Sequence, residues 1–228
     1  MLSPAIFIAF LGGLVPALLW LSFWLMEDRC EPEPKRYIFF TFLAGMLCVA
    51  PVLLFEKVAM SYVDGTLLLL IWATLEELFK FGAAYIVALR ARVFDEPLDA
   101  IIYMVTAALG FAAAENALFL LQPLEHGDVL QSLITGNLRF IGATLLHTLS
   151  SATIGIALAF AYFESARTRK LAAVAGVVLA ISLHTLFNFF ILGNGSGATF
   201  WIFLVIWFGI IALLLGVERI KRPARDYC

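Results

Sequence analysis

The stretch TLLLLIWATLEELFKFGAAYIVAL, residues 66–89, decides the fold. About 20 predominantly apolar residues let a helix cross the hydrocarbon core of a membrane, and this stretch has that length. It also carries Glu76, Glu77 and Lys80, although a charged side chain at mid-depth costs at least about 2.5–3.5 kcal/mol on insertion scales. A compensating partner or a function must therefore exist for these three residues.

The composition of the whole chain is that of a membrane protein. Of 228 residues, 63% are hydrophobic and 14% are charged, against about 25% charged in soluble domains; the mean hydropathy is +0.98. The apolar residues form long blocks and lack the ten-residue alternation of a β-barrel. We predict an all-α, polytopic transmembrane bundle, a single integral membrane domain over residues 1–228. The net charge of −2 gives no indication of a nucleic-acid partner.

Seven apolar segments are predicted to span the bilayer, and the loops between them are short. They are residues 2–26, 37–55, 66–89, 98–121, 138–163, 171–192 and 199–217. Twelve of the 15 Lys and Arg residues follow the first, third, fifth and seventh segments, whereas Lys57 alone lies in the loops on the other side. Because basic loops stay in the cytoplasm, we expect the N-terminus outside, the C-terminus inside, and a multi-pass protein of the bacterial cytoplasmic membrane.

Ionisable and amide side chains recur inside four consecutive segments. They are Glu76, Glu77, Lys80, Glu115, Asn116, His147, His184 and Asn188. At 1.5 Å per residue, Glu76, Glu115, His147 and His184 lie about 15, 9, 14 and 12 Å from the outer ends of their helices. Segments that run in opposite directions thus place their polar groups in one layer of the outer half of the bilayer, which predicts one shared site.

Simpler explanations exist for each residue alone. Glu76 and Lys80, spaced i and i+4, suit a structural ion pair, and an intramembrane His or Asn often makes only an interhelical hydrogen bond. Asn116 is expected to satisfy a backbone group, Arg139 to snorkel to the outer interface, and Glu56 to lie in a solvated loop. Several carboxylates and two histidines in one layer nevertheless favour a function for the set.

Four motifs carry a resemblance to a known family. EELFK at 76–80, FAAAEN at 111–116, HTLSSATIG at 147–155 and HTLFN at 184–188 together resemble the PrsW family of intramembrane proteases, related to the CAAX prenyl proteases and bacteriocin-immunity proteins. The prenyl-protease branch has His where Glu115 stands. The resemblance implies cleavage of a single-pass membrane protein, typically an anti-sigma factor, near the outer face of the membrane, in regulated proteolysis.

Two protease mechanisms and one other function fit these residues. In the favoured mechanism no metal cofactor takes part. Glu76 activates water, Glu77 and Glu115 share the proton, and His147 orients the water. His184 and Asn188 stabilise the oxyanion, Lys80 and Asn116 support these residues, and the four-helix catalytic core extends over residues 66–192. In the alternative, Zn²⁺ is bound by His147, His184 and Glu115. A proton- or metal-coupled transporter would also bury such groups.

Overall fold

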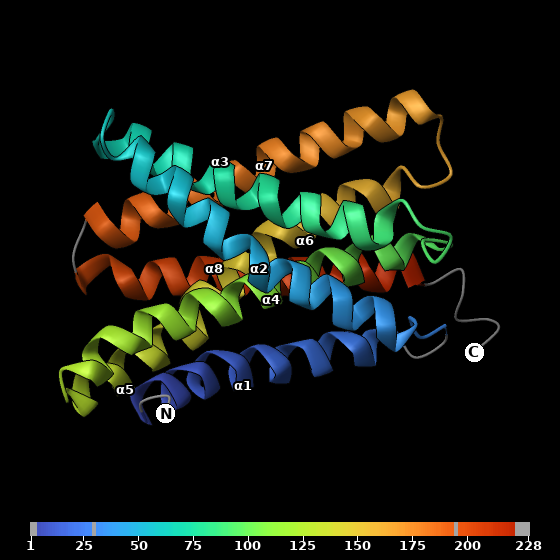
Figure 1. Cartoon of the computed structure of the whole chain (residues 1–228). Helices are drawn as coiled ribbons and strands as arrows, with labels where there is room; N and C mark the ends of the chain where they lie inside the picture. Colours follow the sequence, from blue (N-terminus) through green and yellow to red (C-terminus); the bar gives the residue numbers. More distant parts are fainter. Residues whose placement is uncertain (1–3, 29–30, 194–195, 222–228) are drawn as a thin grey trace.

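The described part of the chain is almost entirely helical, with short turns between the helices. The computed structural model describes residues 4–28, 31–193 and 196–221, which form eight α-helices and two π-helical turns. The elements are α1 (Pro4–Glu27), α2 (Lys35–Ala59), α3 (Gly65–Ala84), η1 (Tyr85–Leu89), α4 (Pro97–Glu125), α5 (Val129–Leu138), η2 (Arg139–Ala143), α6 (Thr144–Phe160), α7 (Ala166–Gly193) and α8 (Ser196–Lys221). Figure 1 shows the long helices lying alongside one another as a bundle.

The helices overlap the apolar segments expected from the sequence, although the helical run at the fifth segment begins at Val129, before the expected start at 138. By length and composition, five are able to cross a membrane: α1, α2, α4, α7 and α8. The helix α3 carries three charged residues, and α6 is shorter, but α5, η2 and α6 follow one another without a break. The prediction of a helical membrane protein is confirmed. The count of seven spans and the orientation stay predictions, and three of the basic residues behind that orientation (Arg29, Arg222 and Arg225) lie outside the described residues.

The helix α4 forms the centre of the bundle. Every residue from Leu98 to Ala113 is buried, as expected for a helix that is hydrophobic all round, and α4 packs against α1, α2 and α6. It begins with Pro97 in its first turn and with a capping box in which Asp99 accepts hydrogen bonds from the backbone of Asp95 and Glu96. These signals fix where the helix starts.

Glycines let α1 and α2 approach the backbone of α4. A Cβ atom added at Gly45 would lie under 3.0 Å from the carbonyl oxygen of Ala107, and one at Gly110 equally close to that of Phe42. Gly13 of α1 meets another α4 carbonyl in the same way. Small residues permit such backbone contacts between membrane helices, and these contacts set the position of α4 relative to the outer helices.

Four acids gather where α1 ends and α4 begins, and we call them the acidic cluster: Asp28, Glu33, Glu96 and Asp99. The hydroxyl of Tyr103 donates to Glu33, and Asp28 accepts from the Glu33 amide at 3.2 Å. Burial raises the pKa of Asp28 to about 6, that of Glu33 to about 9 and that of Glu96 to about 8, and the nearby Asp99 also raises the last two. The loops after the first and third predicted segments therefore meet at one end of the bundle.

Candidate active site

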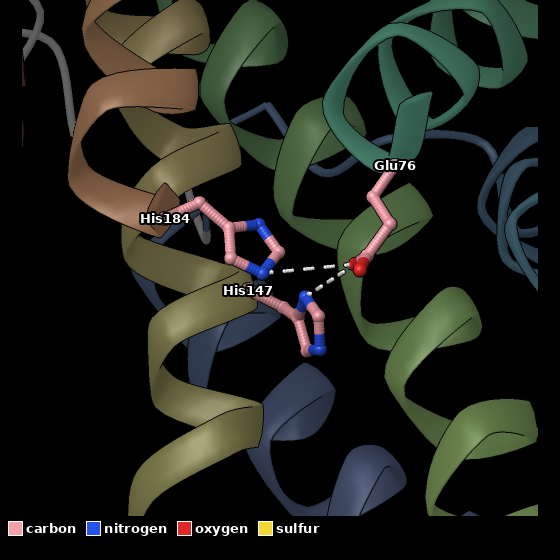
Figure 2. Close-up of side chains that lie close together, drawn as sticks. All are labelled: Glu76, His147 and His184. Carbon is pink, nitrogen blue, oxygen red and sulfur yellow. Dashed lines mark ion pairs between the residues drawn. The ribbon is translucent and has the colours of Figure 1, made fainter. Parts of the chain in front are cut away.

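Three side chains from three helices converge inside the bundle. Glu76 of α3, His147 of α6 and His184 of α7 are buried, with 5%, 2% and 2% of their surface exposed. Glu76 Oε2 lies 3.6 Å from His147 Nδ1 and 3.8 Å from His184 Nε2, and the three ligand-type atoms lie within 4.8 Å of one another. Figure 2 shows the Glu76 carboxylate directed at both imidazole rings.

A second carboxylate holds each imidazole from behind. His184 Nδ1 lies 2.8 Å from Glu77 Oε1, and His147 Nε2 lies 2.9 Å from Glu115 Oε2. An ionised carboxylate only accepts hydrogen bonds, so these two ring nitrogens donate. His184 Nε2 and His147 Nδ1 are therefore the unprotonated nitrogens, and both lie within 4 Å of Glu76 Oε2. Metal-binding histidines commonly donate their other ring N–H to a carboxylate in this way.

Glu77, behind the two imidazoles, accepts hydrogen bonds from three donors, of which His184 is one. Lys80 Nζ lies 2.6 Å from Glu77 Oε1, and the Ser151 hydroxyl donates to Glu77 Oε2 at 2.9 Å. Lys80 is fully buried, and its Nζ is also 3.0 Å from His147 Nδ1 and 3.6 Å from Glu76 Oε2. The sequence predicts a pair between Glu76 and Lys80, whereas the closer partner of Lys80 is Glu77.

Arg139 lies inside the site, although its position at the edge of an apolar segment predicts that it snorkels to the interface. Its Nη2 donates to Glu115 Oε2 and its Nε to Asn116 Oδ1, both at 2.5 Å. Asn116 in turn donates to the Thr144 hydroxyl at 2.9 Å, so its partners are side chains rather than the expected backbone group. A basic residue at the edge of an apolar segment carries no sequence signal for such inward pairing.

A cavity of about 810 Å³ gives access to this cluster. Its lining includes Glu76, Glu115, His147, His184 and Asn188, together with Arg139, Glu56 and apolar side chains such as Trp72, Phe119 and Phe187. The structure therefore brings five of the predicted catalytic residues to one cavity and places Glu77 behind them. Glu56, expected in a loop, belongs to the last turn of α2 and is half-buried.

The residues present fit a divalent metal ion such as Zn²⁺. Two imidazole nitrogens and one carboxylate oxygen are common ligands of catalytic zinc, and Glu76 Oε2 is buried without a hydrogen-bond partner among the described residues. The sequence-based metal set names Glu115 as the carboxylate ligand. In the structure, the carboxylate that lies with the two imidazoles at metal-ligand spacing is that of Glu76, whereas Glu115 contacts the other ring nitrogen of His147, Nε2. Which carboxylate would bind an ion stays a prediction.

Comparison with known proteins identifies the same family that the four sequence motifs resemble. Residues 33–214 match the family described as "PrsW family intramembrane metalloprotease". Proteins named "Protease PrsW" are 26% identical in Geobacillus kaustophilus over 93% of both chains, and 24% identical in Bacillus subtilis over 92% of this chain and 93% of that one. The "Protease PrsW" of Oceanobacillus iheyensis is 27% identical over 92% of this chain and 94% of its own. No solved structure matches significantly.

Proposed function

Because the chain belongs to the PrsW family of intramembrane proteases, we propose that it cleaves a membrane-anchored protein, of the anti-sigma-factor kind, near the outer face of the bacterial cell membrane. The observation that carries this proposal is the meeting of Glu76, His147 and His184 at a cavity between apolar helices. The catalytic core is proposed to extend over residues 66–192. The cut would start a regulated release of the cytoplasmic part of the substrate.

The proposed active form holds a divalent metal ion on Glu76, His147 and His184. Two observations support it: both imidazoles already donate their other N–H to a carboxylate, and Glu76 Oε2 has no hydrogen-bond partner among the described residues. Three protein ligands leave a position for water or substrate, as in catalytic zinc sites. When bound, such an ion polarises the peptide carbonyl and makes water a nucleophile near neutral pH.

The formal charges of the cluster suit an added cation. Glu76, Glu77 and Glu115, when ionised, face the ammonium of Lys80 and the guanidinium of Arg139. Three negative and two positive charges leave one negative charge in a largely buried site. Because an uncompensated buried charge is costly, a cation or a proton completes the balance.

The remaining side chains supply proton transfer and oxyanion binding. Glu115 Oε2 is engaged by Arg139 and His147, whereas Oε1 makes none of the hydrogen bonds found among the described residues. In the proposed reaction, Glu115 Oε1 takes the proton of the attacking water and passes it to the amine as the C–N bond breaks. Asn188, which lines the cavity, donates a hydrogen bond to the oxyanion that develops on the carbonyl.

The metal-free alternative rests on Lys80. Its Nζ, 3.0 Å from His147 Nδ1, is placed to donate into the lone pair that a metal would need. In that case Lys80 supplies the positive charge, and Glu76 is the base that activates water. Binding of a metal requires Lys80 to give up this hydrogen bond while it keeps the one to Glu77 at 2.6 Å.

One experiment tests the function and separates the two mechanisms. Purified protein in lipid nanodiscs is incubated with a panel of single-pass substrates, and its metal content is measured by elemental analysis. We expect cleavage by the wild type, loss in Glu76→Gln, and near-normal cleavage in the matched control Glu56→Gln, an acid that lines the same cavity outside the ligand trio.

The second part of this experiment removes divalent metal ions with a chelator. Loss of cleavage with a chelator and recovery with Zn²⁺ support the metal form, and full activity of protein shown to be metal-free supports the alternative. Ion flux in proteoliposomes without cleavage of any substrate would instead identify a transporter and overturn the protease proposal.

A further inference from the structure

A π-helical turn places Arg139 against three residues of α4. The turn η2 (Arg139–Ala143) interrupts the α-helical run between α5 and α6, and π-turns inside α-helices occur frequently at functional sites. From it, Arg139 donates to Glu115 and Asn116, each at 2.5 Å, and its guanidinium carbon lies 3.9 Å from the centre of the Phe119 ring. A guanidinium held on three sides has little freedom left to snorkel.

Arg139 and His147 share one acceptor atom. Both Arg139 Nη2 and His147 Nε2 donate to Glu115 Oε2, the latter at 2.9 Å. A carboxylate oxygen at Nε2 favours the proton on that ring nitrogen and leaves Nδ1 unprotonated. Arg139 is the cation that holds the oxygen in place.

We propose that Arg139 is a positioning residue for His147 and acts through Glu115. It fixes the Glu115 carboxylate so that His147 keeps its proton on Nε2 and presents Nδ1 to Glu76. Without the guanidinium, Glu115 can turn toward the cavity that it lines, and His147 then loses one of the two contacts that select its tautomer; the other is Lys80 Nζ, 3.0 Å from Nδ1. The effect of Arg139 on catalysis rests on the proposed function. Its effect on the His147 tautomer depends only on the geometry of Arg139, Glu115 and His147.

The first test reads the tautomer directly in metal-free protein. The chain has three histidines, so ¹⁵N NMR of histidine-labelled protein in nanodiscs is simple to assign with a His147→Gln variant. We expect the Nε2–H tautomer of His147 in the wild type, a mixture with the Nδ1–H form in Arg139→Met, and recovery in Arg139→Lys. An unchanged His147 signal in folded Arg139→Met overturns the proposal.

The second test separates positioning from general stabilisation by kinetics. Loss of a residue that orients a ligand typically costs about 10–100-fold in activity, so Arg139→Met should lower kcat by this factor and change KM little. Since Arg139 acts through Glu115, adding Arg139→Met to Glu115→Gln should lower activity no further. Additive losses in the double variant would contradict the proposed route.

A matched control exists at another ion pair of the bundle. Lys221 pairs with Glu27, and the side chain of Lys221 is 15% exposed, close to the 16% of Arg139. Lys221→Met should keep both the His147 tautomer and the kcat of the wild type, and an equal loss in this variant would mean that Arg139 serves stability alone. If the wild type cleaves no substrate, the proposed function fails, while the NMR experiment still decides the role of Arg139.

Discussion

Replacing Glu77 by glutamine removes one charge from the site and leaves its hydrogen bonds possible. Glu77 is fully buried, and its Oε1 accepts from Lys80 at 2.6 Å and from His184 at 2.8 Å, while Oε2 accepts from Ser151 at 2.9 Å. The glutamine oxygen can keep the first two donors. Its amide can donate to the Ser151 hydroxyl, which is able to accept. Any loss of folding stability in Glu77→Gln therefore measures the contribution of the negative charge of Glu77.

The size of the loss follows from the distances. At an effective dielectric constant of 20, two unit charges 2.6 Å apart attract by about 6 kcal/mol, which is the contribution that Lys80 loses. Part of this loss is offset because the variant no longer buries the Glu77 carboxylate, which costs several kcal/mol. Glu76, at 3.6 Å, remains as a partner of Lys80. We expect a net loss of about 3–5 kcal/mol in the free energy of unfolding, as for other broken buried pairs.

The assay is reversible unfolding of the purified protein in detergent micelles by titration with dodecyl sulfate. Lys80→Met should cost a similar amount. The double variant Glu77→Gln/Lys80→Met should cost at least about 2 kcal/mol less than the sum, because neither member of the closer pair is then buried without the other. Glu27→Gln, at a more exposed pair with Lys221, should cost less than about 1 kcal/mol. A loss below about 1 kcal/mol in Glu77→Gln, or additive losses in the double variant, would refute the reasoning.

Further predictions concern packing, pH and buried hydrogen bonds. Gly45→Ala should destabilise by at least about 1–3 kcal/mol in the same assay through a backbone clash with α4, whereas Gly82→Ala, with open space at its Cβ, should not. The unfolding temperature should fall as pH rises from about 4.5 to 9. In this range the folded acidic cluster still holds protons, because its pKa values are raised, whereas the unfolded chain releases them near its ordinary pKa values of about 4. Glu33→Gln should weaken this pH dependence. Ser151→Ala should cost about 1–3 kcal/mol by removing a donor from a buried carboxylate, and more than Ser150→Ala, whose hydroxyl bonds only to a backbone carbonyl.

The helical fold and the convergence of the polar groups could be predicted from the sequence because both depend on transfer free energy. Apolar segments of spanning length dictate helices in a membrane, and the rise per residue gives the depth of each polar side chain. The depths predict that Glu76, Glu115, His147 and His184 meet, and these side chains do lie together. Their catalytic roles stay predictions.

The pairing within the site could not be predicted, because it depends on features with no periodic signal. Arg139 owes its inward direction to the π-helical turn η2 and to acceptors on α4. Lys80 prefers Glu77 at i−3 to Glu76 at i−4, although helix spacing alone permits both. What decides is that the donors Ser151 and His184 already fix the Glu77 carboxylate in place.

The difference between two adjacent acids indicates where the chemistry takes place. Glu77 is saturated by three donors, so a proton or a metal ion could reach it only by displacing one of them. Glu76 keeps a buried oxygen without a hydrogen-bond partner among the described residues, 3.6 Å from His147 Nδ1 and 3.8 Å from His184 Nε2. Such an oxygen is costly to bury unsatisfied, and a metal ion or a proton bound there would satisfy it; the ammonium of Lys80 lies 3.6 Å away. Glu76 is therefore the acid expected to bind the ion or the catalytic proton, and Glu77 is the one that holds the framework around it.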